Sequence, residues 1–184
     1  MRKALWMFLA VGIMACGVVG LKGRAVAQAG APLQPGATAP NFSLPTQVDN
    51  ENASLKQYKG KYVVLYFYPK DMTTGCTIEA HNFERDAAKY AAANAVVLGV
   101  SLDTVESHKT FCSKDGLNFK LLADPDHKVI DAYGVPVMAR GDNKFASRDT
   151  FLIGPDGKIL KFWEVKDIQA HSDEILAAIA EAKK

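Results

Sequence analysis

An unbroken run of apolar residues, rich in β-branched and aromatic side chains, occupies residues 62–68. Polar and apolar positions do not alternate in it, so it predicts a strand covered on both faces, as in a parallel sheet with helices on each side. A second run of this kind occupies residues 96–101. The stretch between the two runs is long enough for a crossover helix. Together they predict a parallel βαβ unit in the middle of the chain.

The remaining hydrophobic pattern extends this unit in both directions. Strands are predicted at residues 41–44 and 119–122, and a hairpin is predicted around the Gly-Pro-Asp-Gly turn at residues 154–157. The patterns with helical periodicity cover residues 78–93, 105–114, 127–133 and 170–183. The order of these elements predicts one α/β layered domain, in which the first strands are parallel and the hairpin is antiparallel.

The first 27 residues have the layout of a secretory signal peptide. Arg2 and Lys3 precede an apolar run that ends at Leu21, and Ala25 and Ala27 are small residues where a signal peptidase reads the chain. We therefore expect cleavage after Ala27 and an exported, periplasmic protein. After cleavage we expect no stable membrane partner.

Two other interpretations of this amino-terminal segment stay open. The apolar run is nearly long enough to span a bilayer, so it could remain as an uncleaved anchor. Residues 13–16 also form a weak lipobox, in which Cys16 would be lipidated. All three interpretations export the domain that follows.

Charge and composition bound the rest of the chain. Residues 28–40 are mainly Ala, Gly, Pro and Gln, which predicts a flexible linker, and the folded domain is expected to cover residues 41–184. The formal net charge is +2, but four basic residues and no acidic one precede residue 28. The mature chain is therefore slightly acidic. Without a clustered basic face, no nucleic-acid partner is expected.

Cys76 is the candidate reactive group. It follows the predicted strand at residues 62–68. In such sheets, reactive groups gather where the carboxyl end of a strand meets the amino end of the next helix. In the first turn of a helix, unpaired backbone N–H groups and the helix dipole favour its thiolate. Thr73 can present a hydroxyl to the sulfur, and Pro69 stiffens the loop. The alternative is a buried and inert thiol.

Residues 68–77 resemble the active-site segment of the peroxiredoxins, and in particular the bacterioferritin comigratory protein (peroxiredoxin Q) branch. Pro69, Thr73 and Cys76 fill the P-x-x-x-T-x-x-C pattern of that family. Residues 147–158 resemble a second family block, whose arginine is Arg148 here. The resemblance covers about residues 35–184. It implies a thioredoxin-like, three-layer α/β fold with a central mixed sheet flanked by helices.

The same resemblance implies a thiol-dependent peroxidase. The thiolate of Cys76 would attack hydrogen peroxide or an organic hydroperoxide and become a sulfenic acid. Arg148 would favour the thiolate and hold the peroxide, while Thr73 and the backbone N–H of Cys76 would donate hydrogen bonds to it. Pro69 would complete this site. We expect no cofactor, and a monomer.

The resolving cysteine departs from the common pattern. Many members of the branch carry it five residues after the peroxidatic cysteine, where this chain has His81. Cys112, 36 positions after Cys76, suits the smaller set that resolves from the following helix. This implies an intramolecular Cys76–Cys112 disulfide, recycled by a dithiol of thioredoxin type. Because the two cysteines should lie on separate helices, we expect their sulfurs to be unbonded in the reduced fold.

Several alternatives stay open. Cys112 could be a structural thiol, with an outside thiol reducing Cys76 directly in a one-cysteine mechanism. The protein could also be an exported redox sensor or thiol–disulfide carrier on the same fold. Carriers use C-x-x-C, and Thr73 and Glu79 occupy the positions three residues from Cys76. The four histidines have no spacing typical of a metal site, so no metal is expected.

Overall fold

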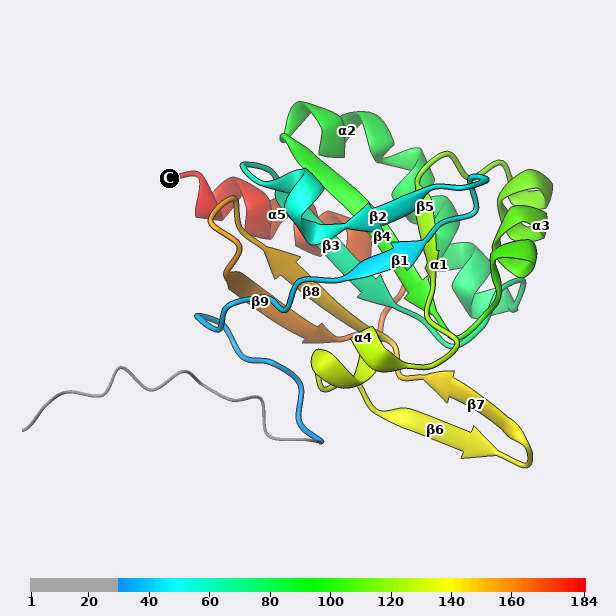
Figure 1. Ribbon diagram of the computed structural model, residues 1–184. Coiled ribbons are helices and arrows are strands. Elements are labelled where there is room, and N and C mark those ends of the chain that lie inside the picture. The colour runs from blue at the N-terminus through cyan, green and yellow to red at the C-terminus, as the bar shows by residue number, and fades with distance from the viewer. Residues whose placement is uncertain (1–29) are drawn as a thin grey trace, which may run out of the picture.

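The computed structural model describes residues 30–184 (Figure 1). The expected signal peptide, residues 1–27, and the alternative lipidation site Cys16 lie outside the described residues. Within residues 30–184, every helix is too short or too polar to cross a membrane.

The centre of the domain is a five-stranded mixed sheet with the strand order β5-β4-β3-β8-β9. Its strands are β3 (Tyr62–Phe67), β4 (Ala95–Ser101), β5 (Lys120–Ala123), β8 (Asp149–Ile153) and β9 (Ile159–Glu164). β4 is parallel to β3 and to β5, whereas β8 is antiparallel to β3 and to β9. The predicted parallel unit and antiparallel hairpin are therefore confirmed.

The side chains of β3 explain why its sequence is apolar without interruption. Val63, Leu65 and Phe67 point into one core, whereas Val64 and Tyr66 point into the other. All six residues of the strand are buried. Since successive side chains of a strand face opposite sides of the sheet, a strand between two covered faces needs apolar residues at every position.

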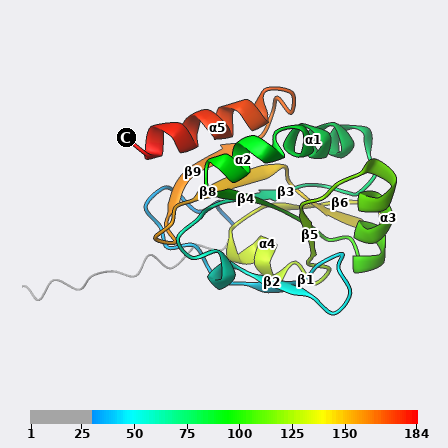
Figure 2. The same cartoon turned by 90° about the horizontal axis from the view of Figure 1, so that it is seen from above.

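Helices cover the two faces of the sheet unequally. Figure 2 shows α1 (Thr74–Arg85), α2 (Ala87–Ala92) and α5 (His171–Ala182) on one side, and α4 (Lys128–Ala132) on the other. α3 (Val105–Asp115) lies beside β5 at the edge of the sheet and contributes to the same core as α1. The three layers that the resemblance implied are therefore present.

Two short antiparallel pairs complete the fold. β1 (Ser43–Pro45) pairs with β2 (Asn52–Ser54), on the α4 side of the sheet (Figure 2). A 3-10 turn, Leu55–Tyr58, follows β2. β6 (Val137–Arg140) pairs with β7 (Asn143–Ala146) in a hairpin that the sequence did not predict. β6 buries almost none of its side chains, so its sequence carries no alternating core pattern.

The single helix predicted at residues 78–93 is two helices, α1 and α2, with a break at Asp86. The Asp86 carboxylate is buried, where it accepts hydrogen bonds from Lys89 Nζ and from Ser172 Oγ of α5, both at 2.8 Å. Residues near the break show helical propensity throughout, and the partner on α5 is distant in sequence. The local pattern therefore cannot reveal the break.

The segment predicted as a flexible linker packs against the domain over residues 31–40. Leu33 N–H donates to the Tyr133 carbonyl (3.1 Å), Ala39 N–H donates to the Gly157 carbonyl (2.9 Å), and both side chains are buried. Gly134 permits this close approach, because a Cβ there would lie 1.9 Å from the carbonyl oxygen of residue 31. For these residues the linker prediction is wrong. The signal missed was the hydrophobic Leu33 among small residues.

Candidate active site

Cys76 is the third residue of α1, in the turn that follows β3. Its side chain is buried, with 2% of its surface exposed, at the carboxyl end of a central strand. The first turn of a helix has backbone N–H groups without intrahelical partners. The structure thus places the sulfur next to hydrogen-bond donors and at the positive end of the helix dipole.

Arg148 reaches this sulfur from the link between β7 and β8. Its Nη2 donates to Cys76 Sγ at 3.2 Å. The sheet explains the contact, since Phe67 at the end of β3 is paired with Asp149 at the start of β8. Burial lowers the pKa of Arg148, but Glu79 and Cys76 outweigh burial and raise it, so the guanidinium stays charged.

Glu79 holds the other side of the same guanidinium. It lies one turn after Cys76 on α1, is buried, and its Oε2 pairs with Arg148 Nη1. Burial raises the pKa of Glu79 to about 7, against the opposing charge of Arg148. The sequence alone is equally compatible with a Glu79 that forms hydrogen bonds near the active-site loop and with a solvated Glu79 in the first turns of the helix. Its i+3 spacing from Cys76 is the signal that places both side chains on one helix face.

Thr73 and Pro69 lie in the loop that leads into α1. Thr73 occupies the N-cap position, where its carbonyl accepts from Thr77 N–H at 2.9 Å. Its hydroxyl donates to the Lys70 carbonyl at 3.1 Å and is exposed, so in this structure it does not donate to the Cys76 sulfur. Met72, before it, has φ +58°, an uncommon conformation for a residue with a side chain.

Cys112 lies near the end of α3 and is half-buried. Cys76 and Cys112 both contact the core on the α1 side of the sheet, and both are free thiols. The sulfurs are therefore unbonded, as expected for the reduced fold. Burial, with smaller contributions from Asp71 and Glu84, raises the pKa of Cys112 to about 12.

A second buried polar group lies beside this pair of cysteines. The Asp71 carboxylate accepts hydrogen bonds from Tyr68 Oη and Ser107 Oγ, both at 2.7 Å, and lies 2.8 Å from His108 Nδ1. The sequence indicates no role for Asp71 or His108. Ser107 and His108 lie more than 30 residues from Asp71, so no local pattern could reveal their contacts with it.

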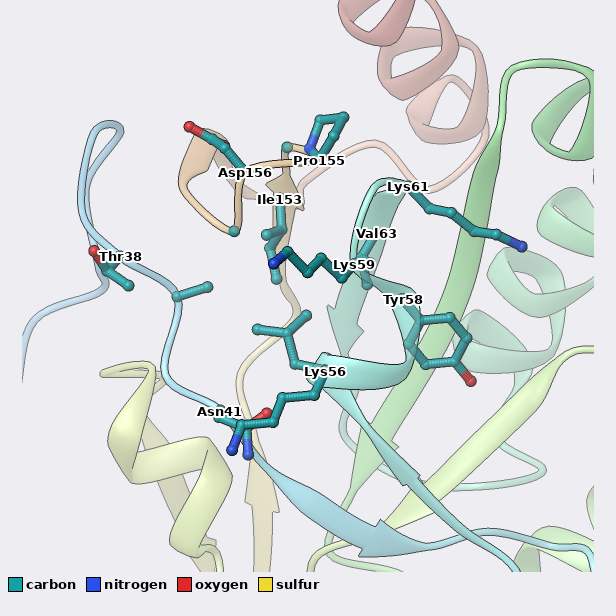
Figure 3. A pocket seen from close by; sticks show the side chains of 14 residues that line it. Thr38, Asn41, Lys56, Tyr58, Lys59, Lys61, Val63, Ile153, Pro155 and Asp156 are labelled. Atoms are coloured by element: carbon teal, nitrogen blue, oxygen red, sulfur yellow. The ribbon is translucent and has the colours of Figure 1, made fainter.

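Within residues 30–184, no group of three or more His, Cys, Asp or Glu side chains could hold a metal ion. The domain also has a cavity that lies apart from the Cys76 thiol. Figure 3 shows a cavity lined by residues that include Lys56, Lys59, Val63 and Ile153. Val63 and Ile153 pair near the start of β3 and the end of β8, whereas Cys76 follows the other end of β3.

Comparison with known proteins agrees with this arrangement of residues. The model of the AhpC/TSA family matches residues 35–162, which span both Cys76 and Arg148. The chain belongs to the AhpC/TSA family. Peroxiredoxin Bcp of Bacillus subtilis is 40% identical over 147 residues, which cover 78% of this chain and 93% of that relative. Peroxiredoxin Bcp of Escherichia coli K12 is 39% identical over 152 residues, 79% and 94% of the two chains.

Solved peroxiredoxin structures are similar over most of the chain. Peroxidoxin BcpB of Mycobacterium tuberculosis has a TM-score of 0.76 at 30% identity, covering 83% of this chain and 99% of its own. A cysteine-to-serine variant of PrxQ from Xylella fastidiosa has a TM-score of 0.77 at 32% identity, covering 84% and 100%. These comparisons confirm the thioredoxin-like fold and the resemblance to the peroxiredoxin Q branch. The protein is accordingly a peroxiredoxin, a thiol peroxidase.

Proposed function

We propose that this peroxiredoxin reduces hydrogen peroxide and organic hydroperoxides through a sulfenic acid on Cys76. The observation that carries the proposal is the contact between Arg148 Nη2 and Cys76 Sγ, at 3.2 Å, with Glu79 holding the far side of the guanidinium. A related solved structure, that of Xanthomonas campestris bacterioferritin comigratory protein, is described in terms of alkyl peroxide reduction. That description supports the inclusion of organic hydroperoxides.

In the first step, the Cys76 thiolate attacks one peroxide oxygen and the O–O bond breaks. The sulfur becomes a sulfenic acid, and the second oxygen leaves with the bonding electron pair as water or an alcohol after protonation. Arg148 and the backbone N–H groups at the start of α1 would stabilise the charge that develops on the leaving oxygen. Thr73 would add its hydroxyl once a peroxide competes with the Lys70 carbonyl, and Pro69 would keep the loop in place.

In the second step, Cys112 would form a disulfide with Cys76, which a dithiol of thioredoxin type would then reduce. Both thiols contact one core, and they lie 36 residues apart. Two solved variants of Xanthomonas campestris peroxiredoxin Q each lack one cysteine, at positions that are also 36 residues apart. A one-cysteine mechanism is the second candidate, because the raised pKa of Cys112 makes it a weak nucleophile in the folded state.

A pair of cysteine variants tests this proposal. Cys76→Ser should abolish peroxide consumption in the presence of thioredoxin and its reductase, because it removes the only thiol proposed to attack the peroxide. The matched variant Cys112→Ser should still consume one equivalent of peroxide per chain. Retained turnover in Cys76→Ser would exclude the proposed chemistry, and full turnover in Cys112→Ser would favour the one-cysteine mechanism.

A further inference from the structure

A buried cluster of hydrogen bonds joins the loop before Cys76 to α3, the helix that carries Cys112. We call it the Asp71 cluster, and it consists of the side chains of Tyr68, Asp71, Ser107 and His108. Asp71 lies five residues before Cys76, and His108 lies one helical turn before Cys112. The cluster therefore connects the two segments that the resolving step must bring together.

The Asp71 carboxylate is the centre of this cluster. Oδ1 accepts from Tyr68 Oη at 2.7 Å, and Oδ2 accepts from Ser107 Oγ at 2.7 Å and from His108 Nδ1 at 2.8 Å. The side chains of Asp71 and His108 are fully buried. Burial alone would raise the pKa of Asp71, but the three hydrogen bonds lower it below its usual value, so the carboxylate is ionised. Hydrogen bonds to an ionised acceptor are stronger than those between neutral groups.

The backbone of Asp71 provides a second connection to the start of α3. Its N–H donates to Asp103 Oδ2 at 2.9 Å, and Ser101 Oγ donates to the same oxygen at 2.7 Å. Asp103 belongs to the link between β4 and α3. On the far side of the ring, His108 Nε2 is buried without a hydrogen-bond partner among the described residues. Opening the cluster would expose this nitrogen to water, which partly offsets the hydrogen bonds that are lost.

In the structure, where the cluster is closed, the thiols of Cys76 and Cys112 are free. Cys76 is in the first turn of α1 and Cys112 is near the end of α3, and neither is bonded. A disulfide requires Cα atoms within about 7 Å, closer than the axes of packed helices usually stand. We therefore expect at least one of the two helices to move or unwind, and the Asp71 cluster joins the loop before α1 to the first turn of α3.

We propose that Asp71 and His108 are positioning residues for the resolving step. The cluster holds the loop and α3 in the arrangement that reacts with peroxide, and its opening lets Cys112 reach the sulfenic acid on Cys76. The role rests on the proposed function. In that step the two sulfurs bond, the S–O bond of Cys76 breaks, and the oxygen leaves as water with the thiol proton of Cys112.

Opening of the cluster competes with a second oxidation. While the cluster stays closed, another peroxide molecule can oxidise the sulfenic acid of Cys76 to a sulfinic acid, releasing water or an alcohol. A weaker cluster should therefore give faster disulfide formation and less sulfinic acid. A substitution that merely damages the site would instead slow both oxidations.

Four variants separate these outcomes. His108→Leu removes the imidazole donor, whereas His108→Asn keeps an N–H close to the position of Nδ1. Tyr68→Phe removes the hydroxyl that donates to Asp71. The matched control is Tyr133→Phe, because the Tyr133 hydroxyl makes a partly buried hydrogen bond of 2.8 Å to the Pro40 carbonyl, and its ring lies in the core on the other side of the sheet.

Each reduced protein is mixed with one equivalent of hydrogen peroxide, quenched at millisecond intervals, alkylated and analysed by mass spectrometry. We expect the disulfide to form about tenfold faster in His108→Leu and about threefold faster in Tyr68→Phe, as weaker hydrogen bonding predicts. His108→Asn and Tyr133→Phe should stay close to the wild-type rate. With excess peroxide, the sulfinic fraction should fall as the disulfide rate rises.

Unchanged or slower disulfide formation in both His108→Leu and Tyr68→Phe would overturn the role of the cluster. Equal acceleration in Tyr133→Phe would overturn it too, since general loosening would then explain the effect. If His108→Leu does not fold, Tyr68→Phe against Tyr133→Phe decides the question. A wild-type protein that forms sulfenic acid but no Cys76–Cys112 disulfide would instead refute the proposed resolving step.

Discussion

The contacts of Arg148 show how the active site is held together. Its two terminal nitrogens contact different partners, Cys76 on one side and Glu79 on the other. A planar guanidinium can do this because its donors have fixed directions, whereas an ammonium is a single point charge. The side chain is therefore held in place before any peroxide arrives. Its positive charge can then stabilise the leaving oxygen with little rearrangement of the site when the O–O bond breaks.

Replacing Arg148 should slow the first oxidation of Cys76 while leaving the fold intact. Arg148→Ala should cost about 3 kcal/mol of transition-state stabilisation, or on the order of a hundredfold in rate, measured by stopped-flow with hydrogen peroxide. Arg148→Lys should lose less, because it keeps the charge but not both contacts. The double variant Arg148→Ala, Glu79→Gln avoids an unpaired buried carboxylate and should be as slow as Arg148→Ala. A near wild-type rate in either alanine variant would exclude this role.

Individual residues differ in how far their roles can be predicted from the sequence. Cys76, Arg148 and Cys112 could be singled out because they match family positions and bear reactive or charged groups. Asp71 and His108 could not be singled out, since neither belongs to a recognisable motif. Their contact depends on how α3 packs beside the loop. Buried polar groups whose partners are distant in sequence become visible only once the elements are placed.

Among the elements, α5 makes a contact that should be visible in the acid stability of the protein. His171 begins this helix, and its buried ring lies with Nε2 2.9 Å from Thr150 Oγ1 of β8. Burial, with a smaller effect from Arg148, lowers the pKa of His171 to about 4. The helix therefore docks on the sheet through an uncharged imidazole.

Between pH 6.5 and pH 4, the unfolded chain binds a proton at His171 and the folded protein does not. The contribution of His171 to the free energy of unfolding therefore decreases as the pH decreases, by about 3 kcal/mol over this range. Glu79 and Asp149, whose pKa values burial raises, act in the opposite direction. Urea titrations should show that the difference in free energy of unfolding between wild type and His171→Gln becomes smaller toward acid pH. A constant difference would contradict the assignment.

The elements themselves were mostly predictable. The strands of the central sheet and the terminal helix follow from continuous or periodic apolar residues, and their observed bounds agree within a few positions. The break between α1 and α2 and the β6–β7 hairpin were missed. The break depends on the Asp86–Ser172 contact, and the hairpin is largely exposed, so neither leaves a hydrophobic pattern in the chain.

At the scale of the whole molecule, residues 31–40 are part of the domain. A chain that begins at residue 41 would lose the buried Leu33 and Ala39 side chains and the backbone hydrogen bonds beside them. Relative to a chain that begins at residue 28, it should be less stable by about 3 kcal/mol, measured by denaturant unfolding. Leu33→Ala in the longer chain should account for about 2 kcal/mol of this. Identical midpoints for the two lengths would show that the segment adds nothing.

We also propose that the protein is exported and that cleavage after Ala27 leaves this packed segment intact. The support is the sequence of residues 1–27, with its basic start, apolar run and small residues before the cleavage site. The intact mass of protein from a periplasmic fraction should correspond to a chain that begins at Gln28. A lipidated chain that begins at Cys16, or a full-length chain in the membrane fraction, would contradict cleavage there.

In the proposed catalytic cycle, both thiols belong to one protein chain. This can be measured by peptide mapping under non-reducing conditions, on reduced protein treated with one equivalent of hydrogen peroxide. We predict a single new linked peptide pair, joining Cys76 to Cys112 within one chain, that disappears when reduced thioredoxin is added. A free Cys112 thiol during continued turnover with thioredoxin would exclude the Cys76–Cys112 disulfide from the cycle, and Cys76 would then have to be reduced by an outside thiol.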